Sequence, residues 1–152
     1  MVSIRRATAA DAATVHGLMC ELAEYQNQES AITVSVDRMR EFLARPEITY
    51  LLAERGGRAV GYVSWFERAS LWSGTDYLAL DDLFVRDGER GQGTGERLML
   101  AASEAAKGRV VRWEVAAANV AAQRFYRRIG ATLISKTICR WQTTEPGAIR
   151  ES

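Results

Sequence analysis

The stretch RGQGTGERL, Arg90–Leu98, connects a strand-like segment to a helix-like one, and the rest of the chain is best understood from it. The run LDDLFV (Leu80–Val85) precedes it, and apolar residues at helical spacing follow it. A loop between a strand end and a helix start presents unpaired backbone N–H groups and the positive end of the helix dipole. Its glycines let the backbone approach an anion without an obstructing Cβ, and Arg90 adds a charged donor. The stretch therefore predicts a phosphate-binding loop.

Two common nucleotide-binding loops do not match these residues. A P-loop has Gly-Lys-Ser/Thr at the helix start, whereas Glu96 and Arg97 follow the last glycine here. The dinucleotide fingerprint is closer, since Gly91 and Gly93 have its spacing and Glu114 lies about 20 residues beyond. Its third glycine, however, would fall on Glu96, which would bring a carboxylate close to the pyrophosphate. The motif also follows antiparallel strands instead of opening a βαβ unit, so neither interpretation fits.

Length and composition set the broad class of the protein. The chain has 152 residues and a formal net charge of +1, which suits one domain with its own core and gives no argument for nucleic acid or membrane as a partner. Cys20, Cys139 and the single histidine, His16, match no metal-ligand spacing. We therefore expect no metal, and we interpret the cysteines as packing residues and His16 as a structural residue. The start lacks a signal-peptide pattern, and no apolar run reaches the ~20 residues of a membrane span. We expect a cytoplasmic protein with one domain over residues 1–142 and a flexible C-terminal tail over 143–152.

Periodicity and turn residues predict an α/β fold. Strands are expected over residues 2–6, 49–54, 59–66, 77–85 and 110–115, with a last strand or two over 132–141. The pair Gly56-Gly57 predicts a hairpin between the second and third of these strands. Helices are expected after the capping candidates Thr8 and Asp11, after Ser35, over 94–107 and over 120–129. Antiparallel strands first and β-α-β-α-β afterwards indicate a mixed sheet that carries helices.

The pattern Arg90-x-x-Gly93-x-Gly95 after the strand resembles the signature of the GCN5-related N-acetyltransferase (GNAT) superfamily, which wraps the pyrophosphate of acetyl-coenzyme A. The chain is most similar to the branch of spermidine/spermine (diamine) and thialysine acetyltransferases. The matching pieces occur in order: IRRATAAD, ELAEYQ, AVGYVSWF, Trp72 and Gly74, YLALDDLFV, the glycine loop, Asn119, and FYRRIGA. The resemblance implies a mixed, mostly antiparallel sheet with splayed central strands and flanking helices. It also implies acetyl-coenzyme A as the cofactor and a homodimer.

The resemblance further implies where this cofactor binds. The pantetheine arm would lie between the splayed strands, along the backbone of Leu83, Phe84 and Val85. The pyrophosphate would lie against Arg90, Gly91, Gln92, Gly93, Thr94, Gly95 and Glu96. Asn119 and Ala122 would line the other side, and Tyr126 would lie near the sulfur and protonate the leaving thiolate. From the residues alone, Asn119 is equally readable as a helix N-cap, and Tyr126 as a core aromatic residue.

The attacking amine must lose a proton before it can react. A primary alkylamine has a pKa near that of lysine, ~10.4, so only a small fraction is nucleophilic at neutral pH. A carboxylate at the strand can orient the ammonium and accept its proton, directly or through water. In the resembled branch a Glu-Asp pair stands in this strand, and here the pair is Asp81-Asp82. The resemblance therefore implies Asp81 as the catalytic carboxylate, and strand alternation would turn Asp82 to the opposite side. The predicted substrate-binding residues are Tyr25, Gln26, Trp72, Asp81 and Asp82.

Several positions depart from the polyamine branch. Gln26, Lys136 and Arg140 stand in regions where the branch commonly has acids, and Ala118 stands where it often has tryptophan. These changes weaken the prediction of spermidine or spermine. We expect an N-acetyltransferase that acts on a primary amine of a small polyamine-like or diamino metabolite by direct attack in a ternary complex. An aminoglycoside N-acetyltransferase, a protein or peptide N-acetyltransferase and a non-catalytic acyl-coenzyme A-binding regulatory domain stay open as alternatives.

Overall fold

The computed structural model describes residues 1–146, which form two compact units, Met1–Glu114 and a second unit that begins at Val115. The first unit contains the sheet and three α-helices, with two short 3-10 turns at Ala9–Asp11 and Glu29–Ala31. Its strands and α-helices are β1 (Ser3–Arg6), α1 (Ala12–Tyr25), α2 (Val36–Leu43), β2 (Ile48–Arg55), β3 (Arg58–Ala69), β4 (Asp76–Val85), α3 (Thr94–Ala106) and β5 (Val111–Arg112). The expected helices and strands of this unit are confirmed, although β5 is shorter than expected.

The five strands are ordered β1-β2-β3-β4-β5. All neighbours are antiparallel except β4 and β5, which run parallel. The β2–β3 hairpin turns at Gly56 and Gly57, whose φ angles of +59° and +78° lie where glycine is favoured. The parallel pair covers only Leu78–Val111 and Ala79–Arg112, so no ladder continues on the β5 side of β4 beyond Ala79 in residues 1–146. The mixed, mostly antiparallel and splayed sheet is thereby confirmed.

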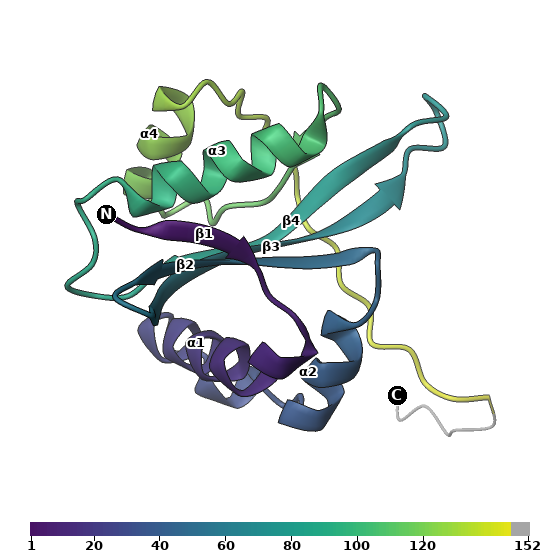
Figure 1. The fold of residues 1–152 in the computed structure, drawn as a ribbon. Helices are drawn as coiled ribbons and strands as arrows, with labels where there is room; N and C mark the ends of the chain where they lie inside the picture. Colours follow the sequence, from purple (N-terminus) through teal and green to yellow (C-terminus); the bar gives the residue numbers. More distant parts are fainter. Residues whose placement is uncertain (147–152) are drawn as a thin grey trace. The chain divides into compact units, whose positions relative to one another are not determined.

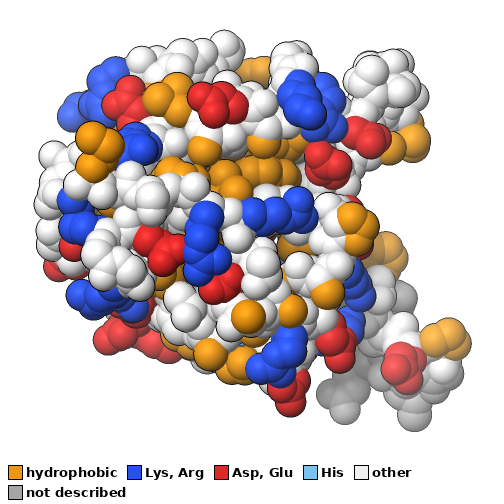
Figure 2. Space-filling model, in the orientation of Figure 1, with side chains coloured by type: hydrophobic (Ala, Val, Ile, Leu, Met, Phe, Trp, Pro, Cys, Tyr) orange, Lys and Arg blue, Asp and Glu red, His pale blue; other side chains and the backbone are white. Residues whose placement is uncertain are grey.

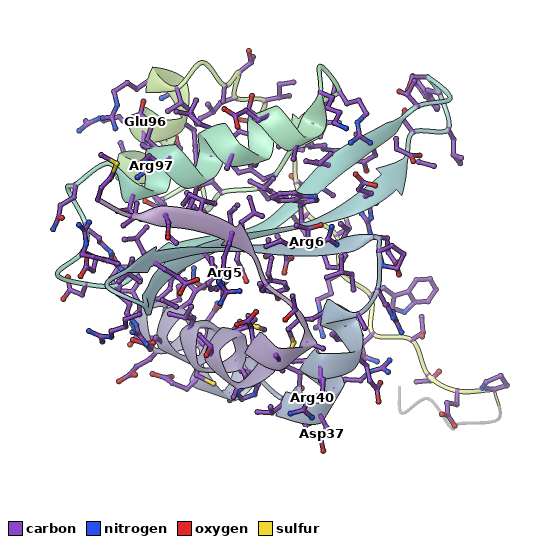
Figure 3. The ribbon with its side chains drawn as sticks, in the orientation of Figure 1. Arg5, Arg6, Asp37, Arg40, Glu96 and Arg97 are labelled. Atoms are coloured by element: carbon purple, nitrogen blue, oxygen red, sulfur yellow. The ribbon has the colours of Figure 1, made fainter. Side chains whose placement is uncertain are left out.

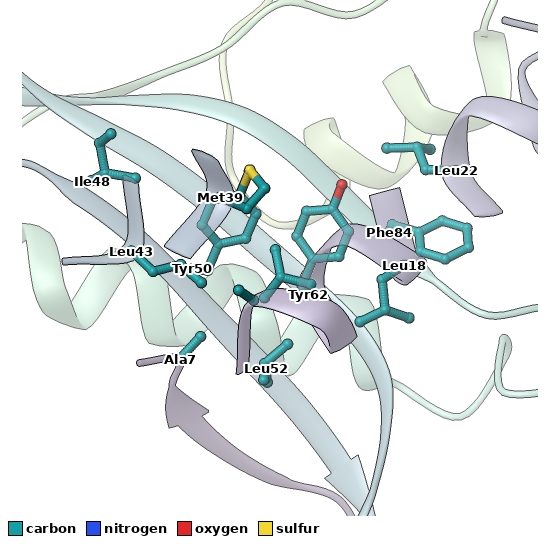
Figure 4. Close-up of a cluster of buried hydrophobic side chains, with 12 residues drawn as sticks. Ala7, Leu18, Leu22, Met39, Leu43, Ile48, Tyr50, Leu52, Tyr62 and Phe84 are labelled. Carbon is teal, nitrogen blue, oxygen red and sulfur yellow. The ribbon is translucent and has the colours of Figure 1, made fainter. Parts of the chain in front are cut away.

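Helices cover both faces of the sheet within the first unit. Helices α1 and α2 lie on one face and α3 lies on the other (Figure 1). Val15 and Leu18 of α1 are fully buried, as their helical spacing predicts. They belong to a core cluster that also contains Leu52, Tyr62 and Phe84, shown in part in Figure 4. The sheet therefore has a densely packed face that α1 and α2 cover, and the two predicted carboxylates, Asp81 and Asp82, lie on this face.

The second unit contains α4 (Val120–Arg128). The side chain of Asn119 accepts a hydrogen bond from the Ala122 backbone N–H at 3.1 Å, which confirms the N-cap interpretation. The strand expected over 132–141 is wrong, because this segment has no regular secondary structure. Its alternating apolar residues Ile134 and Ile138 are 77% and 71% exposed, and a strand needs a ladder partner and a buried face to hold such residues. Residues 147–152 of the predicted tail lie outside the described residues.

The surface carries charges of both signs. Basic and acidic side chains are interspersed over the face drawn in Figure 2, in keeping with the net charge of +1. Within residues 1–146, no helix is long and apolar enough to cross a membrane. No group of histidine, cysteine and carboxylate side chains in the same residues could hold a metal ion.

The remaining predictions about single residues have mixed outcomes. The imidazole Nε2 of His16 donates to the Val34 carbonyl at 2.7 Å, which fits a structural residue. Cys20 and Cys139 are both exposed, so their interpretation as packing residues is wrong. Cys20 lies one helical turn after His16, with its Sγ 3.7 Å from the imidazole Nδ1, on the edge of the apolar stripe of α1.

Candidate active site

A β-bulge in the sheet determines where the two central aspartates lie. The register between β3 and β4 shifts between Val63 and Trp65, so that Ser64 faces both Asp81 and Asp82. A bulge of this kind interrupts the strict alternation of side chains along a strand. The Ser64 hydroxyl accepts the backbone N–H of Asp82 at 3.2 Å, which fixes the bulged segment.

Both carboxylates lie on the face of the sheet beneath α1 and α2. Asp82 accepts a hydrogen bond at 3.1 Å from the hydroxyl of Tyr62, a residue of the core cluster on this face. Asp81 lines a cavity together with Met19 of α1 and Met39 of α2. The expectation that the two aspartates point to opposite sides is therefore wrong, and the bulge is the physical reason.

The cavity has a volume of about 370 Å³, a size that suits a small organic ligand. Most of its wall is apolar and is built by Met19, Val34, Met39, Phe42, Ile48, Tyr50, Trp65 and Phe66. Its polar side chains are Asp81, Ser64, Arg45 and Glu47. The cavity thus combines carboxylates with walls that pack against hydrocarbon.

Burial changes the proton affinities around this cavity. Burial raises the pKa of Asp81. It raises the pKa of Asp82 to about 6, with a further rise from the charge of Asp81 and an opposing effect of the Tyr62 hydrogen bond. Burial and the charge of Asp82 also raise the pKa values of Tyr50 and Tyr62, so both phenols keep their protons. A carboxylate with a raised pKa is a better proton acceptor, as a general base requires.

The glycine loop leads into a helix N-terminus that no side chain caps. Gly93 is the N-cap residue of α3, with a left-handed φ of +79° and no side-chain cap hydrogen bond. The backbone N–H groups at the start of a helix have no intrahelical acceptor, and the first one bonded is Arg97 N–H, to Gly93 oxygen at 3.0 Å. A Cβ built on Gly91 or Gly93 would meet open space. Free N–H groups beside an open backbone fit a pyrophosphate.

Thr94 provides a second observation at the same place. Its side chain is buried, with 2% exposed, and its hydroxyl has no hydrogen-bond partner among the described residues. Buried hydroxyl groups normally have a partner, which can be a ligand or an ordered water. The residues of the loop therefore fit an anionic cofactor group held at the start of α3.

Side chains around the loop brace it from the first unit. Arg55 pairs with Glu89 at 2.9 Å and donates to the side chain of Gln92 at 3.1 Å. Glu96 and Arg97 extend from the first turn of α3 (Figure 3), and Arg97 donates to the Val2 carbonyl. The predicted cofactor residues of this loop thus lie together, and those with side-chain contacts brace the loop, while the backbone remains available to a ligand.

The structure separates Tyr25, Gln26 and Trp72 from the cavity, and Asp82 is not among its lining residues either. Arg90 donates to the Val85 carbonyl at 2.9 Å, and its guanidinium lies 4.2 Å from the centre of the Tyr25 ring. Tyr25 therefore lies at the glycine loop, and neither it nor Gln26 lines the cavity. Trp72 is fully exposed in the turn between β3 and β4, and it does not line the cavity either.

The backbone of Leu83, Phe84 and Val85 lies in the part of β4 beyond its short pairing with β5. One edge of this segment has no ladder partner in the described sheet, so its N–H and C=O groups can pair with an extended ligand. On its other edge, β4 approaches β3 closely at Gly61, where a Cβ would lie 2.5 Å from the Phe84 carbonyl oxygen. The predicted pantetheine segment has the required free edge.

The remaining predicted residues belong to the second unit. Asn119 and Ala122 form the N-terminal cap of α4, as described above. The ring of Tyr126 lies 5.3 Å from that of its neighbour Phe125, and burial raises the pKa of its phenol. The phenol therefore carries its proton at neutral pH and has one to donate.

Sequence reasoning missed Tyr62, Ser64, Arg45 and Glu47. Tyr62 and Ser64 look like ordinary residues of an alternating strand, and nothing local indicates the bulge that brings Ser64 to both aspartates. Arg45 and Glu47 flank Pro46, which signals only the end of a helix. Their place at the cavity depends on the packing of α2 on the sheet.

Comparisons with known proteins agree with this geometry. The chain is 29% identical over 143 residues to a bovine (Bos taurus) thialysine N-epsilon-acetyltransferase, covering 86% of this chain and 84% of the relative. It is 30% identical over 130 residues to an aminoalkylphosphonate N-acetyltransferase of Salmonella typhimurium, covering 84% of this chain and 82% of the relative. A solved structure of AAC(6')-Iy, in complex with a bisubstrate analogue of coenzyme A, has a TM-score of 0.76 at 17% identity, covering 95% of this chain and 99% of that chain. This last likeness shows the fold.

The profile of the acetyltransferase (GNAT) family matches residues 16–131, a range that includes the aspartate pair, the glycine loop and Tyr126. The named relatives are N-acetyltransferases. The predicted superfamily and cofactor are confirmed, and the diamine acetyltransferase branch is supported at low identity. The chain therefore belongs to the acetyltransferase (GNAT) family and is an N-acetyltransferase that uses acetyl-coenzyme A.

Proposed function

We propose that the chain transfers an acetyl group from acetyl-coenzyme A to a primary amine of a small diamino or polyamine-like metabolite, by direct attack in a ternary complex. The observation that carries this proposal is the cavity beneath α1 and α2, where the carboxylates of Asp81 and Glu47 interrupt walls that are otherwise mostly apolar. Ammonium groups are attracted to the carboxylates, and the apolar walls pack against the hydrocarbon between them.

The register of the sheet separates these two carboxylates along the strands. Tyr50 pairs with Ser64, and Ser64 faces Asp81 across the bulge. Glu47 lies three residues before Tyr50 in the sequence, which corresponds to ~10 Å along an extended chain. Two amines at the ends of a short chain can therefore contact one carboxylate each. Arg45 lines the same cavity and favours an acceptor that also carries an anionic group.

The residues of the chain have distinct roles in this proposal. Asp81 orients the ammonium and accepts its proton, directly or through water, and its raised pKa supports this role. The backbone N–H groups at the start of α3 hold the pyrophosphate. Acetyl-coenzyme A supplies an activated thioester as the acetyl donor. Tyr126, protonated because burial raises its pKa, donates a proton to the departing thiolate.

Two relatives support an acceptor of this class. The bovine relative is named for the epsilon-amine of thialysine, and the bacterial relative is named for aminoalkylphosphonates. Both names describe small amines. The aminoglycoside acceptor and the protein or peptide acceptor are retained as outcomes of the test. The homodimer and the cytoplasmic location stay predictions, and sedimentation at several concentrations checks the first.

The test is a thiol-release assay with acetyl-coenzyme A and purified protein. The acceptors are thialysine, lysine, an aminoalkylphosphonate, spermidine, an aminoglycoside and a lysine-containing peptide. Highest kcat/KM with one of the short diamino or polyamine-like acceptors supports the proposal. Highest kcat/KM with the peptide or the aminoglycoside would replace it by that alternative. Binding of acetyl-coenzyme A without thiol release for any acceptor would contradict the proposed class of amine.

A further inference from the structure

Tyr62 contacts Asp82 from inside the core. Its side chain has no exposed surface, and its ring lies between Tyr50, with centroids 5.4 Å apart, and Phe84, 6.3 Å away. Figure 4 shows it among Leu18 and the other buried side chains. The hydroxyl donates to Asp82 Oδ2 at 3.1 Å. A rigid aromatic cluster therefore holds this donor in place.

The charged and titratable groups around Asp82 are few. From β4 the neighbour is Asp81, from β3 it is Tyr62, and from β2 it is Tyr50, whose pKa is raised by the charge of Asp82. Helix α1 contributes apolar side chains to this core cluster. No ion pair among residues 1–146 involves Asp81 or Asp82. The Tyr62 hydroxyl is thus the side-chain donor that stabilises the Asp82 charge against burial.

An ionised Asp82 has a consequence for its neighbour. The two carboxylates repel one another electrostatically, as the effect of Asp81 on the pKa of Asp82 shows. This interaction is mutual, so a negative Asp82 increases the proton affinity of Asp81. Any group that keeps Asp82 ionised therefore makes Asp81 a stronger base.

We propose that Tyr62 is a positioning residue for acetyl transfer: its hydrogen bond keeps Asp82 ionised and fixed, and the charge of Asp82 helps Asp81 to take the proton of the substrate ammonium. This inference rests on the proposed function. The N–H bond of the ammonium breaks and an O–H bond forms on Asp81, or on the water between them. Asp82 stays anionic, Tyr62 keeps its proton, and Asp81 returns its proton to solvent after the transfer.

The variant Tyr62→Phe tests the proposal, because it keeps the ring and removes the donor. A hydrogen bond to a charged group favours the charged form, so its loss lets Asp82 take up a proton at higher pH. We expect the acid limb of the kcat/KM profile, near pH 6 from the pKa of Asp82, to move upward by ~1 pH unit. The matched control is Tyr77→Phe, which removes a phenol of β4 that lies outside the cavity. Its pH midpoint should stay that of the native enzyme.

Two results would overturn the proposal: an unchanged midpoint in a folded Tyr62→Phe variant, or an equal shift in Tyr77→Phe. If Tyr62→Phe does not fold, Asp82→Asn replaces it, and the acid limb should then move to lower pH as Asp81 loses its charged neighbour. An unmoved limb in Asp82→Asn contradicts the proposal. Carbon-13 NMR titration of the Asp82 carboxyl provides a readout independent of turnover. The pKa of this carboxyl should rise in Tyr62→Phe even if no amine is acetylated. This readout therefore separates a failure of the proposed function from a failure of the Tyr62–Asp82 interaction.

Discussion

The proposed cofactor side and the proposed acceptor side of the first unit are built in different ways. The cofactor side consists of one continuous segment, Leu83–Glu96, which presents backbone groups of a strand edge and a helix start. The acceptor cavity takes side chains from α1, α2 and three strands, which lie far apart in the sequence. Backbone groups are the same for every residue, whereas side chains at the cavity differ in charge and size. The difference teaches that a short motif can specify the cofactor while the choice of amine depends on distant residues.

The variant Tyr126→Phe should have the largest effect, because it removes a proposed chemical step that belongs to neither of these sites. We expect turnover to fall by ~10²–10⁴ while the Kd values of both substrates stay close to native. Steady-state kinetics with equilibrium binding of acetyl-coenzyme A measures both quantities. A native turnover number would remove Tyr126 from the mechanism.

The variant Asp81→Asn isolates the acceptor side. The amide cannot accept the ammonium proton, so kcat/KM for the amine should fall by ~10² or more. The Kd for acetyl-coenzyme A should not change, because the glycine loop is intact. The matched control is Asp76→Asn, which lies in the same strand and outside the cavity. A weaker binding of acetyl-coenzyme A in Asp81→Asn would contradict the separation of the two sides.

The variant Gly93→Ala isolates the cofactor side. A methyl group there would enter the open space at the helix start, at a φ of +79° that alanine disfavours. We expect the KM for acetyl-coenzyme A to rise by ~10-fold, which corresponds to a free-energy loss of ~1.4 kcal/mol. Gly74→Ala is the matched control, since Gly74 also has a positive φ, +72°, and open space, but lies in the β3–β4 turn. An equal rise in KM for both variants would show that the effect is general destabilisation.

The pH dependence of stability gives the smallest effect and tests the acceptor side without substrate. The pKa of Asp82 is raised to about 6 in the folded chain from an ordinary value of 3.8. The folded state therefore binds more protons than the unfolded state between these values. The contribution of Asp82 to stability is present below pH 4 and is lost as the pH rises through 6. Urea unfolding measures the free energy of unfolding of the native chain and of Asp82→Asn from pH 4 to pH 7. This free energy should decline less with rising pH in the variant. Parallel curves would contradict the raised pKa.

Some features of the fold followed directly from local sequence. Gly56-Gly57 predicted the hairpin, Ser35 predicted the start of α2, and its hydroxyl does accept the Arg38 N–H at 3.0 Å. The strand prediction over 132–141 was wrong, because alternating apolar residues form a strand only when a partner strand completes the ladder. The position of Tyr25 was also not predictable, because its stacking with Arg90 joins the end of α1 to a loop 65 residues away.

By itself, the sequence determined that the chain has an anion-binding loop before a helix and that two aspartates lie in the preceding strand. Its resemblance to the acetyltransferase family added which cofactor this loop suits. Glycine spacing and strand periodicity act locally, so they remain readable without the fold. Only the tertiary structure decided that both aspartates lie on the same face of the sheet and that Asp81 lines the cavity, since a bulge depends on the register between two strands. It also decided that Tyr62 contacts Asp82, and that Arg45 and Glu47 line the cavity. These contacts depend on packing between distant segments, which no local pattern in the chain records.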